Sequence, residues 1–430
     1  MKRIAAFLAV AIAATATQAQ TRLTFDEALR RALEVNNTVE RARFDIDYAE
    51  AYKTGLLSAV FPRITLQGNM TRNSIQQTFG GGEGGDELTI LPRNDWAYQI
   101  VLSQPIFAGL REQRAYSQAK IGVENAREGA GLTEDSVLLR VASSYLAVVN
   151  ADRRVAVERS NIELAEKRLV QAQAFFDAGE VTKVDVLRAE TAMKAAQRLL
   201  AVVVQQREHA AAQLRIDLDL DGPIEVVPPA QNLPALPPVS DLQTRATTVR
   251  HEVDIAANNV RIANLEVKKQ RGFWYPTVTF DGGLINQKTP FPADRYSYGA
   301  LRFSVPIFQS GEVFARVAGA KAQEKQAEIA LQEAQLSARE DVNRALADLR
   351  SAETGLQLAN EQLTAAQAEY EQAFELYRAQ EATSLDVASS EQSLADARRA
   401  VAEETLNRDL AELRVWFAAG SIKEAVGVAK

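Results

Sequence analysis

Two equally long stretches, 201 positions apart, decide the fold of this chain: VASSYLAVVNADRRVAVERSNIELAEKRLVQAQAFF at 141–176 and VNRALADLRSAETGLQLANEQLTAAQAEYEQAFELY at 342–377. Each has a large apolar residue at every seventh position: Val141, Val148, Val155, Ile162, Leu169 and Phe176, then Val342, Leu349, Leu356, Leu363, Tyr370 and Tyr377. An alanine follows most of them by three residues, which lets helix axes approach closely. A sustained repeat of seven is typical of a helix whose apolar seam faces a partner helix. We therefore expect a duplicated pair of very long packed helices.

Residues 1–19 have the pattern of a secretory signal peptide, because basic Lys2 and Arg3 precede an apolar stretch and a Thr17-Gln18-Ala19 cleavage site. The full chain has 49 Lys and Arg residues against 56 Asp and Glu, a formal net charge of −7, which argues against a nucleic-acid partner. It has no cysteine, which excludes a disulfide framework and a lipidated N-terminal cysteine.

The composition also argues against a catalytic or metal-binding site. Only two histidines occur, His209 and His251, and they lie far apart in the sequence. In the stretch 324–340 the Glu residues are interspersed with Gln and Lys, which is typical of a solvated helix. Nowhere in the sequence do a nucleophile, a base and an orienting group occur together. We therefore expect no catalytic, cofactor-binding or metal-binding residues and no enzyme activity.

The duplication extends beyond the two stretches. Pro105-Ile106-Phe107 recurs as Pro306-Ile307-Phe308 at the same offset of 201, while upstream residues such as Pro62 and Pro276 differ by 214. The additional residues of the first copy are assigned to the flexible glycine-rich loop at 80–85. Each half is predicted to run helix, helix, strand, loop, strand, long helix, helix.

The first repeat, 20–220, is predicted to hold strands at about 63–73 and 95–104, a long helix at 110–178 and a helix at 183–218. The second, 241–420, holds strands at about 277–287 and 296–305, a long helix at 311–379 and a helix at 383–419. Between them, the Pro-rich residues 217–240 are predicted to form a connector outside the wall that the packed helices of the two repeats make. Residues 421–430 are predicted to be a C-terminal tail.

The predicted strands alternate in polarity over about 10 residues, the length that a tilted membrane strand needs. In the first strand Ile64, Leu66 and Met70 share one face, and in the second Trp96, Tyr98, Ile100 and Leu102 do. Aromatic residues at the strand ends suggest a membrane-interface girdle: Phe61, Trp96, Tyr98, Phe107, Trp274, Tyr275, Tyr296 and Tyr298. The strand pattern alone fits soluble hairpins equally well, and the signal peptide and the repeat favour the membrane.

Apart from the signal peptide, no segment approaches the ~18 consecutive apolar residues of a membrane helix. A chain without such helices can enter a bilayer only as a closed β-barrel, since open strand edges are not tolerated in lipid. Four strands are too few to close one, so the chain must oligomerise. The expected fold is a mixed membrane α+β fold, internally duplicated, with four antiparallel strands per chain. Three copies supply a twelve-stranded barrel, continued by a long helical coiled-coil barrel.

A helix-turn motif, FFDAGEVTKVDV at 175–186, is repeated as LYRAQEATSLDV at 376–387. With the duplicated plan and the two Pro-Ile-Phe junctions, it makes nearly all of residues 23–420 resemble the TolC-type outer membrane factor family. The resemblance implies a homotrimer in the outer membrane that extends into the periplasm. It also implies a passive exit duct that works with a periplasmic adaptor (a membrane fusion protein) and an inner-membrane pump.

Each turn contains Thr-x-x-Asp, a capping-box pattern, at Thr182 with Asp185 and at Thr383 with Asp386. The resemblance implies that these turns form the periplasmic aperture, where Asp386 rings the opening and Tyr377 makes closing contacts, beside Asp185. Three symmetry-related carboxylates would select cations. This sequence departs from the family pattern at Ala382, where an arginine is expected, and at Ser389, where a second carboxylate is expected. Both departures would weaken closure and selectivity.

Gly179 permits a left-handed helix end. In the second copy Gln380 occupies the position of this glycine. The proposed adaptor contacts are the exposed turn residues Gly179, Glu180, Val181, Thr182, Glu381, Ala382 and Thr383.

Two other functions remain open at this point. The channel could serve type I protein secretion instead of small-molecule efflux, because the pump chooses the cargo. A periplasmic coiled-coil adaptor without a pore is a different class, but it would carry one hairpin per chain, whereas this chain has two. The sequence leaves the transported substrate and the class of pump undetermined.

Overall fold

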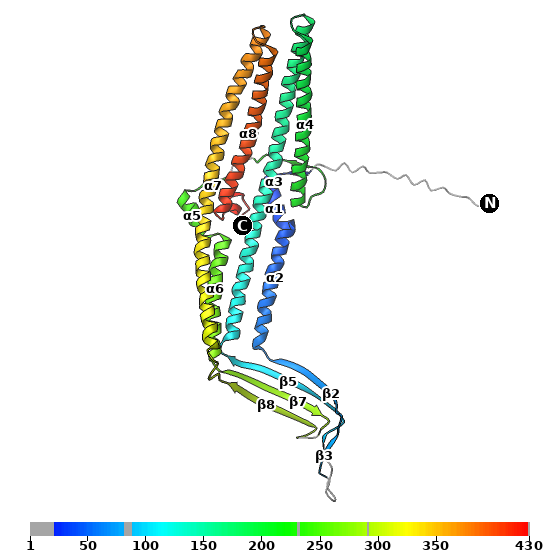
Figure 1. The fold of residues 1–430 in the computed structure, drawn as a ribbon, viewed down its shortest axis with the longest axis vertical. Coiled ribbons are helices and arrows are strands. Elements are labelled where there is room, and N and C mark those ends of the chain that lie inside the picture. Colours follow the sequence, from blue (N-terminus) through cyan, green and yellow to red (C-terminus); the bar gives the residue numbers. More distant parts are fainter. Residues whose placement is uncertain (1–20, 81–87, 230–232, 290–291, 429–430) are drawn as a thin grey trace, which may run out of the picture. The chain divides into compact units, whose positions relative to one another are not determined.

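The computed structural model describes residues 21–80, 88–229, 233–289 and 292–428. The predicted signal peptide and most of the glycine-rich loop at 80–85 lie outside these residues. Figure 1 shows the helices and strands of the chain. The chain divides into two compact units. Unit 1 comprises the chain up to Val39, Glu134–Leu242 and Asp341 onward, and unit 2 comprises Glu40–Thr133 and Gln243–Glu340.

The two long helices are equal in length. Helix α3 runs from Arg111 to Asp177 and α7 from Glu312 to Arg378, 67 residues each. Their return helices, α4 (Lys183–Asp217) and α8 (Ser384–Ala418), have 35 residues each. The seam that begins at Val141 and Val342 is buried at both of those residues. Most of the seam alanines are buried too, as close packing of helices requires.

Unit 1 has a hydrophobic core that draws on both ends of the chain. Strand β1 (Thr21–Leu23) pairs in parallel with β6 (Ile224–Val226), and α1 (Phe25–Val35) follows β1. The fully buried Tyr145 of α3 holds this pair, because its hydroxyl lies 2.9 Å from the Leu23 carbonyl oxygen and accepts a hydrogen bond from the Val227 N–H. Burial raises the pKa of Tyr145 to about 12.

Two segments for which no helix or strand was predicted join the core of unit 1. The connector at 217–240 contains β6, whose Ile224 and Val226 are buried in this core. Helix α5 (Val239–Thr248) also begins within the predicted connector. The predicted tail contains helix α9 (Ile422–Ala425), whose Ile422 is fully buried in the same core. In both segments a few apolar residues, too few to show a period, are covered by the long helices.

Unit 2 contains most of α2 (Asn37–Leu57), together with η1 (Ser58–Val60), α6 (His251–Arg271) and η2 (Gly272–Trp274). Its main sheet has the order β2-β5-β7-β8, with every neighbouring pair antiparallel. The strands are β2 (Arg63–Arg72), β5 (Asn94–Ala108), β7 (Thr277–Gln287) and β8 (Arg295–Ser304). A separate pair, β3 (Gln77–Phe79) and β4 (Leu88–Leu91), flanks the glycine-rich loop.

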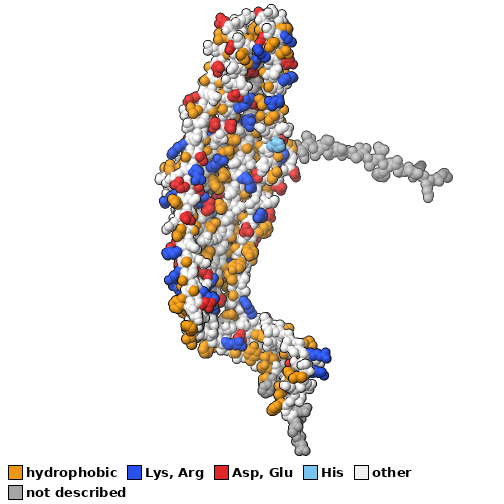
Figure 2. All heavy atoms as spheres, viewed as in Figure 1, with side chains coloured by type: hydrophobic (Ala, Val, Ile, Leu, Met, Phe, Trp, Pro, Cys, Tyr) orange, Lys and Arg blue, Asp and Glu red, His pale blue; other side chains and the backbone are white. Residues whose placement is uncertain are grey.

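The strand register separates an apolar face of the main sheet from a polar one. Directly opposed residues share a face, and Ile64, Leu102, Gly282 and Gly299 are opposed in turn across the four strands. The apolar face therefore carries Ile64, Leu66 and Met70 of β2, Trp96, Tyr98, Ile100 and Leu102 of β5, Phe280 and Leu284 of β7, and Leu301 and Phe303 of β8. Many of these side chains are exposed, with Met70 at 90% and Phe303 at 77%. Figure 2 shows hydrophobic side chains gathered over the strands.

The second strand of each repeat ends differently. Strand β5 continues through Pro105-Ile106-Phe107 to Ala108, beyond the predicted end at 104, because β7 pairs with it along this length. Strand β8 ends at Ser304, before the second Pro-Ile-Phe. Among the described residues, no helix is both long enough and apolar enough to cross a membrane.

Candidate functional site

The turn between α3 and α4 ends one helix and starts the next within five residues. Gly179 has φ +79°, its N–H donates to the Phe176 carbonyl oxygen, and the Glu180 N–H donates to that of Phe175. These two bonds form a Schellman motif, which requires a left-handed residue at this place.

The turn between α7 and α8 repeats that geometry without glycine. Gln380 has φ +65°, its N–H donates to the Tyr377 carbonyl oxygen, and the Glu381 N–H donates to that of Leu376. A left-handed conformation costs a non-glycine residue about 1–2 kcal/mol. The second turn therefore holds strain that the first does not.

Both predicted helix caps are confirmed. The Thr383 N–H and hydroxyl donate to the Asp386 carboxylate at 2.8 and 2.6 Å, and the Asp386 N–H donates back to the Thr383 hydroxyl at 3.3 Å. In the first turn, the Thr182 N–H and hydroxyl donate to Asp185 at 3.2 and 2.8 Å. These bonds favour the ionised acid, so the pKa of Asp386 lies below its ordinary range.

Asp185 differs from Asp386 because it also joins the two turns. The Ser384 hydroxyl, at the start of α8, donates to the other oxygen of Asp185. This bond, followed by that from Thr182, lowers the pKa of Asp185. The Asp185 side chain is 17% exposed, whereas Asp386 is exposed.

Tyr377 lies inside the helix packing, at 4% exposure. Its ring meets Phe175 of α3 edge to face, with centroids 5.4 Å apart. Within the part of the chain that the structure describes, its buried hydroxyl has no hydrogen-bond partner. Burial, and then the charge of Asp185, raise the pKa of Tyr377. Ser389, by contrast, is exposed on α8.

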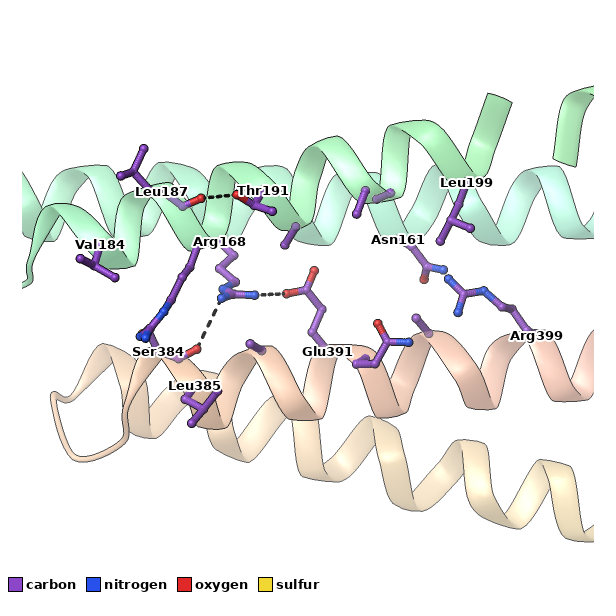
Figure 3. A pocket seen from close by; sticks show the side chains of 17 residues that line it. Asn161, Arg168, Val184, Leu187, Thr191, Leu199, Ser384, Leu385, Glu391 and Arg399 are labelled. Carbon is purple, nitrogen blue, oxygen red and sulfur yellow. Dashed lines mark hydrogen bonds and ion pairs between the residues drawn. The ribbon is translucent and has the colours of Figure 1, made fainter. Parts of the chain in front are cut away.

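Behind the turns, a buried ion pair links α3 to α8 (Figure 3). The Arg168 Nη1 atom lies 3.1 Å from Glu391 Oε2, and the two side chains are only 5% and 14% exposed. Arg168 also donates to the Ser384 carbonyl oxygen. Burial raises the pKa of Glu391, against the opposing effect of Arg168.

A second ion pair joins the same two helices, since Arg399 Nε lies 2.7 Å from Glu158, which is 3% exposed. Together with Arg168 and Glu391, Arg399 lines a groove of about 540 Å³ between α4 and α8, with α3 beneath it. Sequence reasoning missed these residues, because the partners are more than 200 positions apart and no local pattern marks them.

The predicted adaptor-contact residues divide by exposure. Gly179, Glu180, Thr182, Glu381 and Thr383 are exposed, while Val181 and Ala382 are half-buried. Ala382 packs against the apolar cluster around Tyr377. In this sequence the place of the expected arginine is therefore part of the helix packing.

The predicted interface aromatics do not all lie on one face of the sheet. Trp96 and Tyr98 stack with centroids 5.6 Å apart on the apolar face. Tyr296 and Tyr298 are opposed to Ile285 and Gly283, which places them on the polar face, so a lipid-facing role does not follow for them. Three other aromatic residues lie just before strands and are exposed: Phe61, Trp274 and Tyr275. Phe107 lies within β5 and is half-buried.

In residues 21–80, 88–229, 233–289 and 292–428, no group of three His, Cys, Asp or Glu side chains is placed to hold a metal ion. The model of the outer membrane efflux protein family matches residues 28–216 and 243–421, one match in each repeat. The chain belongs to this family.

The predicted TolC-type membership is thereby confirmed, and with it the function of an efflux duct in the outer membrane. This efflux protein is 23% identical to the outer membrane efflux protein BepC of Brucella suis over 395 residues, covering 90% of this chain and 83% of BepC. A crystal structure of a membrane protein from Pseudomonas aeruginosa has the same fold, with a TM-score of 0.78 at 17% identity, covering 92% of this chain and 90% of the other. The Campylobacter jejuni CmeC outer membrane channel gives 0.75 at 17% identity, covering 93% and 86%.

Proposed function

We propose that three copies of this efflux protein form one exit duct of a tripartite efflux system for small molecules. In this proposal the four strands of each copy contribute to a twelve-stranded outer-membrane barrel, and the long helices continue it as a periplasmic barrel. The apolar face of the main sheet carries the proposal, because exposed side chains such as Ile64, Leu66 and Phe303 need a lipid environment.

Extraction and mass test this assembly. The full chain, expressed in a Gram-negative host, should stay in the outer membrane after a high-salt wash and need detergent for release. In detergent its native mass should be that of a trimer. Release by salt alone, as a monomer, would instead support a peripheral adaptor without a pore.

The two turns are proposed to close the periplasmic end, with Asp386 carboxylates from three copies around one opening. Asp386 suits this role because it is exposed and its lowered pKa keeps it ionised. Three nearby carboxylates would favour cations in the opening. Tyr377, Asp185 and Ser389 are proposed to lie beside that ring.

Planar-bilayer conductance tests the ring. Asp386→Ala should raise the leak and lower cation selectivity. Asp386 also caps α8, so Asp386→Asn and Thr383→Ala separate charge from cap: the first should lose selectivity, and the second should keep it. Glu369→Ala, an exposed carboxylate on α7, is the matched control. Unchanged selectivity in Asp386→Ala and Asp386→Asn would remove Asp386 from the aperture.

The exposed turn residues are proposed to contact the periplasmic adaptor, which connects the duct to an inner-membrane pump. A photo-cross-linking residue at position 381 should capture the adaptor in cells, and one at the exposed Gln206 in α4 should not. Equal capture at both positions would show that the turns have no special part in docking.

A further inference from the structure

A cavity of about 730 Å³ lies in unit 2, where α6 ends and α7 begins. Its lining includes Arg271, Trp274, Tyr275, Phe314 and Lys321. Among the described residues that line it, two are cations and none is a carboxylate. In Figure 1 these helix ends lie beside the start of β7 and the end of β8. The cavity is therefore positively charged and lies where the chain passes from helices into the main sheet.

Aromatic rings form one wall of the cavity. The Trp274 ring meets the Phe314 ring edge to face, with centroids 5.0 Å apart. Despite this contact Trp274 is 47% exposed and Phe314 is 69% exposed, and Tyr275 is exposed as well. Clustered apolar surface left in water marks an interaction site, and Trp and Tyr favour the boundary between lipid and water. The wall is therefore suited to an apolar ligand.

Two unpaired cations also line the cavity. Arg271 and Lys321 are exposed, and neither side chain has an ion pair or a hydrogen bond within the part of the chain that the structure describes. Both charges are therefore available to an anion from outside the chain.

Two neighbouring cations, by contrast, already have partners. Lys269 Nζ lies 2.5 Å from the Glu266 carboxylate. Arg316 forms an ion pair with Glu312, and its guanidinium lies over the Phe273 ring, 4.8 Å from the centroid. The lack of a partner therefore distinguishes the cations of the cavity from others at the same end of the helices.

The first repeat does not carry the same set of side chains. At the offsets of 214 and 201, Leu57 stands in the place of Arg271 and Gln113 in the place of Phe314. Only the lysine is shared, since Lys120 corresponds to Lys321. The combination of two cations with exposed aromatic rings therefore belongs to the second repeat, and Lys120 provides a matched control.

We propose that this cavity binds an anionic phospholipid. Arg271 and Lys321 hold the phosphate of its headgroup, and an acyl chain lies against Trp274 and Phe314. The proposal rests on the membrane-spanning sheet proposed above. Because β7 begins at Thr277, just after Tyr275, the cavity lies where that sheet leaves the lipid on its helical side.

The chemistry of the lining favours a lipid over a soluble anion. A guanidinium binds phosphate oxygens through two N–H groups and an ammonium adds a point charge, as in other basic pockets that bind lipid headgroups. A soluble anion would use these cations alone and leave Trp274 and Phe314 in water. A phospholipid occupies both parts of the cavity.

Native mass spectrometry of the full chain in detergent tests the site, with phosphatidylglycerol or phosphatidylcholine added. The protein should retain phosphatidylglycerol in preference to phosphatidylcholine. Arg271→Gln/Lys321→Gln should abolish this preference, with affinity roughly fivefold lower for each cation removed. Lys120→Gln, which removes one exposed charge from the corresponding position of the first repeat, should keep it.

Quenching of Trp274 fluorescence locates the bound lipid. In Trp96→Phe, Trp274 is the exposed tryptophan, because Trp416 is 4% exposed. In bilayers of both lipids, phosphatidylglycerol with brominated acyl chains should quench this emission more than brominated phosphatidylcholine does. The added changes Arg271→Gln/Lys321→Gln should make the two lipids equal quenchers.

The same mass spectra separate this proposal from the proposed function. A trimer that holds phosphatidylglycerol equally well in the wild type and in Arg271→Gln/Lys321→Gln would overturn the lipid site and leave the duct, as when a second copy covers the cavity. Loss of the bound lipid on addition of inorganic phosphate would show a site for soluble anions and would also overturn it. A monomer mass would overturn the duct, and the lipid preference of that monomer would then decide the site by itself.

Discussion

The two copies of the repeat have the same helices but end their seams in different surroundings. At the last seam position, Phe176 of the first copy is 37% exposed and Tyr377 of the second is 4% exposed. The cluster around Tyr377 draws on α3 as well as on α7 and α8, through residues such as Phe175. The corresponding cluster of the first copy contains only residues of α3 and α4.

The duplicated segments therefore share a backbone geometry but differ in the residues packed around them. The second hairpin is packed against the first, so its tip can move only if contacts such as Tyr377 with Phe175 and Asp185 with Ser384 are broken. Four sets of variants test this asymmetry.

Removing one partner of the buried ion pair should have the largest effect. Glu391→Ala leaves Arg168 buried without its carboxylate, and we expect a loss on the order of 3 kcal/mol in unfolding free energy, measured by denaturant unfolding in detergent. Glu190→Ala, the exposed residue at the equivalent position of the first copy, should change little. Arg168→Met/Glu391→Met should recover much of the loss. Equal effects of the two single variants would mean that the pair does not distinguish the copies.

The two turns should respond oppositely to exchange of their left-handed residue. Gly179→Gln should destabilise the protein by about 1 kcal/mol, and Gln380→Gly should stabilise it by a similar or smaller amount. Unfolding midpoints of both variants under one set of conditions provide the measurement. A loss of stability in Gln380→Gly would show that the Gln380 side chain contributes more than its strained backbone costs.

Acid should weaken the first turn more than the second. A lowered carboxyl pKa gives stability that is complete above the unfolded value of about 3.9 and is lost as the pH falls through the folded value. Asp185 holds Ser384 of the other hairpin, so Asp185→Asn should flatten the dependence of stability on pH below about pH 4, and Asp386→Asn should do so less. Matching pH curves for the two variants would contradict this difference.

The smallest effect on stability is expected at Tyr377. Because its hydroxyl has no partner among the described residues, Tyr377→Phe should change the unfolding free energy by less than about 0.5 kcal/mol. If the hydroxyl makes closing contacts in the trimer, the leak conductance should still rise. An unchanged leak would leave Tyr377 as a packing residue only.

The parts of the fold with a repeating pattern were predictable from the sequence. The heptad seam indicates α3 and α7, and alternation places Ile64, Leu66 and Met70 on one face, because both signals arise from the geometry of single elements. The capping boxes are equally local. The short strands β1 and β6 and the helix α9 have no such period, so their burial under the long helices could not be foreseen.

The limits at the candidate site have the same origin. Arg168 and Glu391 are ordinary helix-surface residues until the fold brings two distant helices together. The face of Tyr296 and Tyr298 depends on a register of one residue, which position near a strand end does not determine. Prediction was accurate for contacts within four residues and weakest for pairs that the tertiary fold creates.

The parallel pair of β1 and β6, closed by Tyr145, has a consequence for the order of folding. Unit 1 is built from both ends of the chain, and its core includes Leu23 and Ile422. An emerging chain cannot complete that core until Ile422 has been exported, whereas the main sheet of unit 2 needs nothing beyond Ser304. Contacts of such long sequence separation form slowly. The sheet edges are therefore complete, and open to other chains, before unit 1 can close.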